Sequence, residues 1–178
     1  MRIFKTQVVC LLLCTFSLVT FSCDNGDSGE DVAQDLDDSP VGEFTSAQVG
    51  GVDYFASPSI SDNTVWAVII PSQSNMLFNA NNGNGERIRF EIKNYQGEGV
   101  YSFGNTSNEN TIRFMRNLGP SDLPNGDWIC IGPQASCMVT ITKDDGMEVE
   151  GTFSFEGFSI FSDTSLLVTE GKFRANIE

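Results

Sequence analysis

Beyond residue 43 the chain alternates apolar and polar residues at every second position, a period that favours β-strands over helices. Between Arg87 and Lys93, three apolar residues alternate with four charged ones. Ile88, Phe90 and Ile92 are therefore expected on one face of an extended strand with the charges on the other, as in a half-buried antiparallel sheet. No window has the 3.6-residue period of an amphipathic helix longer than two turns.

Two segments near the C-terminus repeat this alternation. From Met147 to Glu156 the odd positions, beginning with Met147, are expected to face the core. In the last segment the residues expected to face inward are Leu167, Gly171, Phe173, Ala175 and Ile177. Shorter strands are expected at residues 44–49, 52–56, 64–70, 100–103, 111–115, 128–131 and 137–142.

Turn-forming residues separate these strands. Gly50 and Gly51 stand between two strand segments and predict a two-residue hairpin. Residues 143–146 predict a second hairpin turn, in which Gly146 is free to adopt a positive φ. Short strands at this spacing predict an all-β domain over residues 43–178, with a single antiparallel β-sandwich or barrel-like fold.

Two properties of the composition exclude several classes of site. The 178 residues include no histidine, which excludes a Ser-His-Asp triad, a histidine-ligated metal and a histidine pH switch. The 24 acidic residues outnumber the 10 basic ones and give a net charge of −14 at pH 7. Because nucleic-acid binding rests on Lys and Arg contacts with phosphates, no nucleic-acid partner is expected. No cofactor and no metal site is indicated.

The first 22 residues are predicted to be a signal peptide rather than part of the fold. Arg2 and Lys5 form a short basic head, and residues 8–21 are mainly apolar. This apolar stretch is shorter than the ~20 residues that a membrane-spanning helix needs, so it fits a signal better than a permanent span.

The apolar stretch ends at Ser22 and Cys23, and a small residue before a cysteine at this place resembles the bacterial lipoprotein signal. In that class the cysteine is lipidated and becomes the first residue of the mature chain, so the resemblance implies acylation of Cys23. Two or three acyl chains hold a protein stably on a membrane, at ~0.8 kcal/mol per buried CH₂. The alternative is an ordinary secretory signal, which leaves Cys23 free or paired, although the usual A-x-A-like end is absent.

Residues 23–42 are predicted to be a flexible tether. Seven of the seventeen residues from Asp24 to Pro40 are acidic, and none is basic or aromatic. Such a segment buries too little apolar surface to offset the entropy of ordering, and its charges repel one another. The EF-hand pattern of a calcium loop is absent. Acidic residues directly after a lipidated cysteine resemble the surface-export signal of Bacteroidota lipoproteins, which implies an outer-membrane protein whose domain faces outward from the cell.

Three short β-strand motifs extend this resemblance into the domain. They are Gly51-Val52-Asp53-Tyr54-Phe55, Gly151-Thr152-Phe153-Ser154-Phe155 and Thr169-Glu170-Gly171-Lys172-Phe173. In these motifs the domain resembles the uncharacterised lipoproteins of Bacteroidota that carry a single β-rich domain of unknown function. The resemblance covers roughly residues 43–178 and implies the fold and the location, and the family supplies no catalytic residues.

Cys130 and Cys137 are the two cysteines that remain for the domain once the signal and Cys23 are set aside. The turn-forming pair Gly132-Pro133 lies between them, so two strands joined by this loop can bring the cysteines within the ~5.5–6 Å Cα separation of a disulfide. We therefore expect a structural disulfide. A redox role is disfavoured, because the chain has no C-x-x-C motif and no basic neighbour that would lower a thiol pKa.

Two asparagine-rich segments, residues 79–85 and 105–110, are predicted to be long loops, and their amide groups suit sugar hydroxyls or a weak cation site. Burial is expected for Trp66 in its apolar run, whereas Trp128 beside a Pro/Gly loop is the better candidate for a stacking platform at the surface. A glycan site is expected if Trp128 and the two loops meet at one concavity. The possible ligand-binding residues are Trp128, Asn81, Asn82, Asn84 and Asn108.

These features predict a membrane-anchored cell-surface lipoprotein with a non-catalytic binding or accessory domain, whose partner is a glycan or an envelope protein. Carboxylates such as Glu91 and Glu148 fall on the polar faces of strands, where a solvated role is expected. Two alternatives stay open. A carboxylate-dependent glycan hydrolase needs two carboxyl groups facing each other, ~5–5.5 Å or ~6.5–9.5 Å apart. A structural envelope or fimbria-like subunit needs an unprotected edge strand.

Overall fold

The computed structural model describes residues 40–104, 109–117, 126–132, 136–159 and 161–178, all within the unit formed by residues 38–178. The predicted signal, Cys23 and most of the acidic tether lie outside the described residues. The described residues form eleven strands and no helix. The strands are β1 (Phe44–Val49), β2 (Val52–Ala56), β3 (Thr64–Ile70), β4 (Asn75–Asn81), β5 (Glu86–Ile92), β6 (Gly99–Ser102), β7 (Thr111–Arg116), β8 (Gly126–Ile129), β9 (Met138–Asp144), β10 (Glu148–Ser159) and β11 (Ser165–Asn176).

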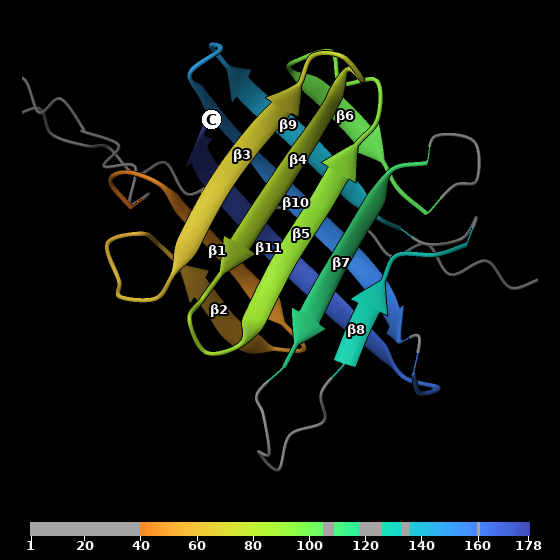
Figure 1. The fold of residues 1–178 in the computed structure, drawn as a ribbon. Coiled ribbons are helices and arrows are strands. Elements are labelled where there is room, and N and C mark those ends of the chain that lie inside the picture. The colour runs from red at the N-terminus through yellow and green to blue at the C-terminus, as the bar shows by residue number, and fades with distance from the viewer. Residues whose placement is uncertain (1–39, 105–108, 118–125, 133–135, 160) are drawn as a thin grey trace, which may run out of the picture. The chain divides into compact units, whose positions relative to one another are not determined.

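The strands pair antiparallel in the order β2-β1-β11-β10-β8-β7-β5-β4-β3. One layer contains β3, β4, β5 and β7, and the strands of a second layer cross behind it (Figure 1). Strand β10 pairs with β9 along its first half and with β8 at its end, and β6 adds to the free side of β9. At the β3 end of the strand order, the backbone N–H of Glu178, which follows β11, donates to the carbonyl of Ala67 in β3 at 2.9 Å. The sheet is thus nearly closed into a barrel-like shape, which confirms the all-β prediction.

Phenylalanine rings fill the space between the two layers. Phe78 and Phe90 stack with their centroids 4.5 Å apart, and Phe173 from the opposite layer lies 4.8 Å from Phe78. The Tyr54 hydroxyl donates to the Ala80 carbonyl at 2.9 Å and so ties β2 to β4 across the core. Burial, and then the charge of Glu86, raise the pKa of this hydroxyl well above its ordinary value, so it stays protonated as a donor.

Reciprocal glycine–phenylalanine pairs join β10 to β11. Gly151 stands opposite Phe173, and Gly171 stands opposite Phe153. A Cβ added at Gly171 would lie 2.5 Å from the ring of Phe153, and one added at Gly151 would lie 2.8 Å from the ring of Phe173. Each ring therefore lies over the glycine of the neighbouring strand, and this contact gives a physical reason for the two Gly-x-Phe motifs.

A β-bulge in β11 overturns one part of the predicted alternation. The register passes from Phe153 opposite Gly171 to Phe155 opposite Val168, which leaves Glu170 as an extra residue with a φ of 55°. Because of this extra residue, the residues of β11 that precede Glu170 face the opposite way from the predicted alternation. Val168 is therefore fully buried, whereas Leu167, predicted to face the core, is 57% exposed. Met147 was also predicted to face inward, and it lies exposed beside the β9–β10 turn, before β10 begins.

Strand β4 is absent from the predicted strands, and its last three residues were placed in an asparagine-rich loop. Met76, Phe78 and Ala80 alternate inward in β4 and are fully buried. Asparagine disfavours strands, so Asn79 and Asn81 conceal this alternation in the sequence. The predicted hairpins are confirmed, because Gly50 and Gly51 both have positive φ and so does Gly146.

The predicted disulfide between Cys130 and Cys137 is confirmed, with the Cα atoms 6.4 Å apart. Cys130 follows β8 and Cys137 precedes β9, so the bond ties together the two strands that share one side of β10. Both cysteines are buried.

Replacing both cysteines by alanine is expected to lower the free energy of unfolding by about 2–3 kcal/mol, because the bond closes a short loop and limits the unfolded chain. Denaturant unfolding of the wild type with and without reductant, beside the double variant, measures this. Equal stability of all three samples would contradict the prediction.

Candidate functional site

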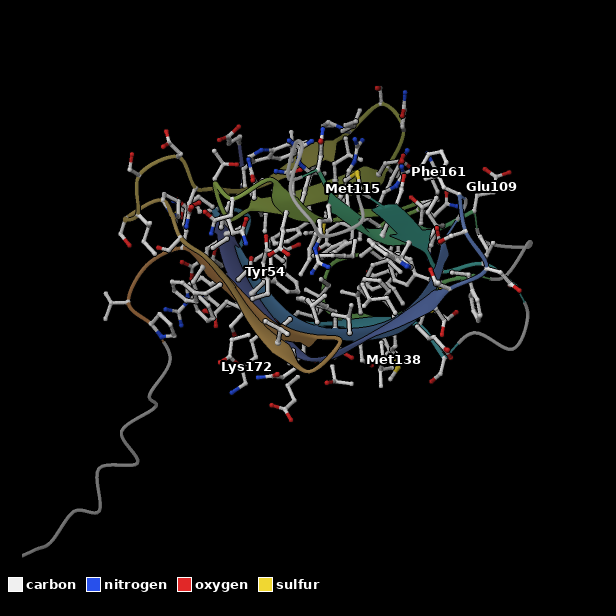
Figure 2. The ribbon with its side chains drawn as sticks, turned by 90° about the horizontal axis from the view of Figure 1, so that it is seen from below. Tyr54, Glu109, Met115, Met138, Phe161 and Lys172 are labelled. Atoms are coloured by element: carbon white, nitrogen blue, oxygen red, sulfur yellow. A yellow bond between two sulfur atoms is a disulfide. The ribbon has the colours of Figure 1, made fainter. Side chains whose placement is uncertain are left out.

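The candidate site lies on the outer face of the layer formed by β2, β1, β11, β10, β9 and β6. Lys172 and Met138 point outward from this layer, whereas Tyr54 points into the core (Figure 2). Two shallow depressions open on this face, on either side of β11, and both are lined by Glu170 and Lys172. We call the two depressions together the trough.

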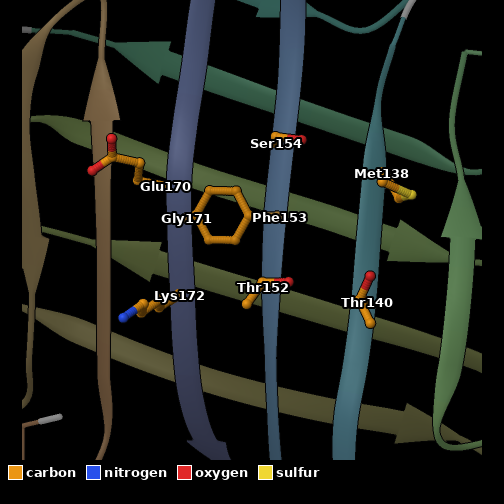
Figure 3. A pocket seen from close by; sticks show the side chains of 8 residues that line it. All are labelled: Met138, Thr140, Thr152, Phe153, Ser154, Glu170, Gly171 and Lys172. Carbon is orange, nitrogen blue, oxygen red and sulfur yellow. The ribbon is translucent and has the colours of Figure 1, made fainter. Parts of the chain in front are cut away.

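The first depression lies over β9, β10 and β11 and has a volume of about 310 Å³. Three hydroxyl side chains line it, from Thr140, Thr152 and Ser154, with Met138 beside them (Figure 3). Gly171 has no side chain, and the ring of Phe153 lies against it from below. The floor is therefore apolar, and the walls carry hydroxyl groups.

The second depression lies over β11, β1 and β2 and has a volume of about 330 Å³. Ser46, Gln48, Asp53 and Phe55 line it together with the two shared residues. The amide Nε2 of Gln48 donates to Oδ1 of Asp53. Phe55 is 39% exposed, so an aromatic surface is accessible at the β2 end of the trough.

Antiparallel pairing places the residues of the trough in two rows that run across the strands. In the first row Thr140 stands opposite Thr152, Thr152 opposite Lys172, and Lys172 opposite Ser46. Ser46 in turn stands opposite Phe55 at one end, and Thr140 opposite Val100 at the other. In the second row Met138 stands opposite Ser154, and Gln48 opposite Asp53.

Several charged residues beside the trough form ion pairs with one another. Glu150 forms ion pairs with Lys143 at 3.4 Å and with Arg174 at 3.3 Å, and Lys143 also contacts Glu148 at 2.7 Å. Burial alone raises the pKa of the Glu150 carboxyl, but Arg174 and Lys143 outweigh it and hold this pKa below its usual value of 4.5. Within the described part of the chain, Glu170 and Lys172 form no ion pair, so their charges are available to a ligand.

The stability of the protein is expected to fall as the pH drops below about 4.5, partly through Glu150. A carboxyl whose folded pKa is depressed stabilises the fold above its unfolded pKa of 4.5, and this contribution is lost as the pH falls through the folded pKa. Unfolding midpoints between pH 7 and pH 3 measure the effect. The Glu150→Gln variant should show a weaker dependence on pH, and an unchanged dependence would contradict the assignment.

The asparagines predicted to bind a ligand are only partly brought together. Asn81 lines a polar cavity of about 500 Å³ at the end of the other layer, together with Asp62, Arg87 and Asn117. Asn82 is used within its own turn, since its Oδ1 accepts from the N–H groups of Asn84 and Glu86. These contacts favour a structural role for Asn82, and Asn84 is an exposed residue of the same turn.

The described residues of the two asparagine-rich segments lie apart. The first lies beside Asn117, whose N–H donates to the carbonyl of Gly85 at 2.8 Å just after β7 ends. The second segment leads into the start of β7, where Asn110 precedes Thr111. They are thus at opposite ends of β7, and Asn108 lies outside the described residues. The condition for a glycan site, that Trp128 and both segments meet at one concavity, is therefore not met by the described residues.

Trp128 is buried rather than available for stacking at the surface. It is 6% exposed, and its ring packs at 5.9 Å from the ring of Phe114. A Cβ added at Gly126 would lie 2.3 Å from the indole, so the ring folds back over its own strand. β8 lies between β7 and β10, and this position in the nearly closed sheet turns Trp128 inward. Trp66 is partly exposed, contrary to the expected burial.

Within the described ranges, no group of three or more Cys, Asp or Glu side chains is placed to hold a metal ion. None of the described segments contains a helix long and apolar enough to cross a membrane.

The trough could not be found from local motifs, because its residues come from five strands between residues 46 and 172. One signal was present in the sequence. Outward positions in neighbouring segments of the chain carry charged residues. At three outward positions the chain instead has a hydroxyl residue, namely Thr140, Thr152 and Ser154.

Comparison with protein families finds one match, to a domain of unknown function, DUF6252, over residues 62–175. A search of curated proteins and a search of solved structures find no match. The matched range extends from just before β3 to Ala175, one residue before the end of β11, and so includes β9, β10 and nearly all of β11, the strands under the first depression of the trough. Because the match covers well over half of the chain, the protein belongs to the DUF6252 family.

Proposed function

We propose that this protein is a cell-surface lipoprotein, anchored in the outer membrane through an acylated Cys23, whose β-domain is a non-catalytic binding module. The observation that carries the anchoring is the order of segments in the sequence. A basic head and an apolar stretch end at Ser22-Cys23, and seven acidic residues follow before Pro40. Two or three acyl chains on Cys23 would hold the otherwise polar mature chain at the membrane surface.

The binding role is supported by the trough, with its exposed Phe55 and with Glu170 and Lys172, which form no ion pair to another described residue. No ion pair within the described residues neutralises these two charges, so both side chains are free to contact a ligand. The partner expected on this surface is a glycan or an envelope protein.

Acylation is tested by labelling native cells with a palmitate analogue and purifying the protein. We expect label in the wild type and its loss in Cys23→Ser. Cys14→Ser is the matched control, because Cys14 leaves with the signal, and it should keep the label. A mature chain with an unmodified thiol at Cys23, found in the aqueous phase of a detergent partition, would overturn the proposal. Digestion by a protease added to intact cells tests the outward orientation, and protection until the outer membrane is broken would contradict it.

A carboxylate-dependent glycan hydrolase is the second candidate, because Asp53 and Glu170 line the same depression. The measurement is the release of reducing ends from polysaccharides. A binding module releases none, whereas release that disappears in Glu170→Gln and in Asp53→Asn would favour the hydrolase.

A further inference from the structure

We infer that the trough binds an uncharged polysaccharide chain, which lies across the strands of β9, β10, β11, β1 and β2. This inference rests on the proposed binding function and names the ligand class and the residues that contact it. The polar groups that line the trough and make no side-chain hydrogen bond or ion pair to a described residue are Ser46, Thr140, Thr152, Ser154, Glu170 and Lys172.

The middle strands of the trough have no free edge at which a ligand strand could add. β11 is paired on both sides, with β1 and β10, and β10 is paired with β11 and β9. The backbone groups under the trough are therefore used within the sheet, and side chains must recognise the ligand. Ser and Thr side chains are short, so the ligand itself must bring hydrogen-bonding groups close to the sheet. A hydroxyl-rich sugar chain does this along its whole length.

The charges of the trough favour an uncharged ligand. Lys172 supplies one positive group, and Glu170 and Asp53 supply two negative ones. The chain as a whole carries −14, so it repels acidic polysaccharides. A carboxylate and an ammonium group each make strong hydrogen bonds to sugar hydroxyls, and Gln48 adds an amide that both donates and accepts.

The spacing of the rows also fits a polymer. Neighbouring strands lie ~4.8 Å apart, so four spacings from β9 to β2 give a trough roughly 19 Å long. A sugar unit in an extended chain advances by about the separation of two strands, so successive units meet Thr140, Thr152, Lys172 and Ser46 in turn. At the β2 end, the exposed ring of Phe55 offers an apolar surface for the face of a terminal sugar.

The backbone of Glu170 gives an independent indication of a functional role. Its φ of 55° lies in the left-handed region that favours glycine, and the side chain is exposed. Glycine would form the same bulge with less strain, so packing does not explain a glutamate here. Non-glycine residues held in this conformation concentrate at binding and catalytic sites.

The test is electrophoresis of the full chain, purified in detergent, through gels that contain one polysaccharide each. The neutral probes are an α-glucan, a mixed-linkage β-glucan, a xylan and a galactomannan, and polygalacturonate is the acidic probe. We expect at least one neutral probe to retard the wild type and polygalacturonate to have no effect. Against the retarding probe, Thr140→Val combined with Thr152→Val should weaken binding about tenfold, because two hydrogen bonds are lost while the β-branched shape is kept.

Two controls separate binding from folding. Thr142→Val changes an exposed residue of β9 that lines neither depression, and it should bind as the wild type does. Glu170→Gly should bind more weakly but melt at the same or a higher temperature, because it relieves the strained φ. A purely structural role of Glu170 predicts no change in binding.

Absence of retardation by every neutral probe overturns the inference. So does retardation that the Thr140/Thr152 change leaves intact, or binding to polygalacturonate alone. Capture of an envelope protein by a photo-crosslinker placed at residue 152, with no bound glycan, would show that the trough serves a protein partner instead. The labelling of Cys23 and the protease test do not involve the trough, so they can succeed while this inference fails.

Discussion

Replacement of Phe173 by alanine is expected to lower the free energy of unfolding by about 3–5 kcal/mol, the range for deleting a buried aromatic ring. Phe173 is 2% exposed, and its ring lies 4.8 Å from Phe78, 5.4 Å from Phe90 and 6.3 Å from Phe153. The cavity would open between the two layers. The strands around it cannot close over it, because backbone hydrogen bonds to neighbouring strands hold them in place. Guanidinium unfolding followed by circular dichroism measures the loss.

Phe161→Ala is the matched control, because Phe161 is 77% exposed and its ring can be removed without opening a cavity. We expect a change within about 0.5 kcal/mol for this variant. A loss below about 1 kcal/mol for Phe173→Ala would show that the core packs differently from the structure described above.

Gly151→Ala is expected to destabilise the fold by about 3 kcal/mol or more, although it adds only one methyl group. The new Cβ would lie 2.2 Å from the carbonyl oxygen of Thr140 and 2.8 Å from the ring of Phe173. The carbonyl belongs to the neighbouring strand of the ladder, so relief requires β9 and β10 to move apart. Thermal unfolding measures the loss.

Ser154→Ala is the control for this variant, since it changes an outward residue of the same strand and should have little effect on the unfolding temperature. Equal stability of Gly151→Ala and Ser154→Ala would contradict the close approach of the two strands at Gly151.

The prediction of the fold succeeded where one face of a strand is buried and no residue is inserted. Ile88, Phe90 and Ile92 were assigned to the core from their alternation with charges, and all three are fully buried. The prediction was wrong at Leu167, because the bulge at Glu170 adds one residue and exchanges the two faces of the strand. A bulge leaves little trace in the sequence when its extra residue is a glutamate rather than a glycine.

The residues predicted to bind a ligand were selected from local composition, and the fold places several of them in structural positions. Of the asparagines in the first segment, Asn79 and Asn81 belong to β4, and the side chain of Asn82 accepts a backbone hydrogen bond within its own turn. Trp128 stands next to a Pro/Gly loop in the chain but is covered once β8 is placed between β7 and β10.

The order of amino acids alone was sufficient for the β class, the hairpin turns and the disulfide between Cys130 and Cys137, because these depend on periodicity, on turn chemistry and on residues seven apart. The trough, in contrast, could be recognised only in the tertiary structure. Ser46 and Lys172 are far apart along the chain and become neighbours only because β1 pairs with β11. Pairing between distant strands is set by how the two layers close over a shared core, and no short window of the chain contains that information.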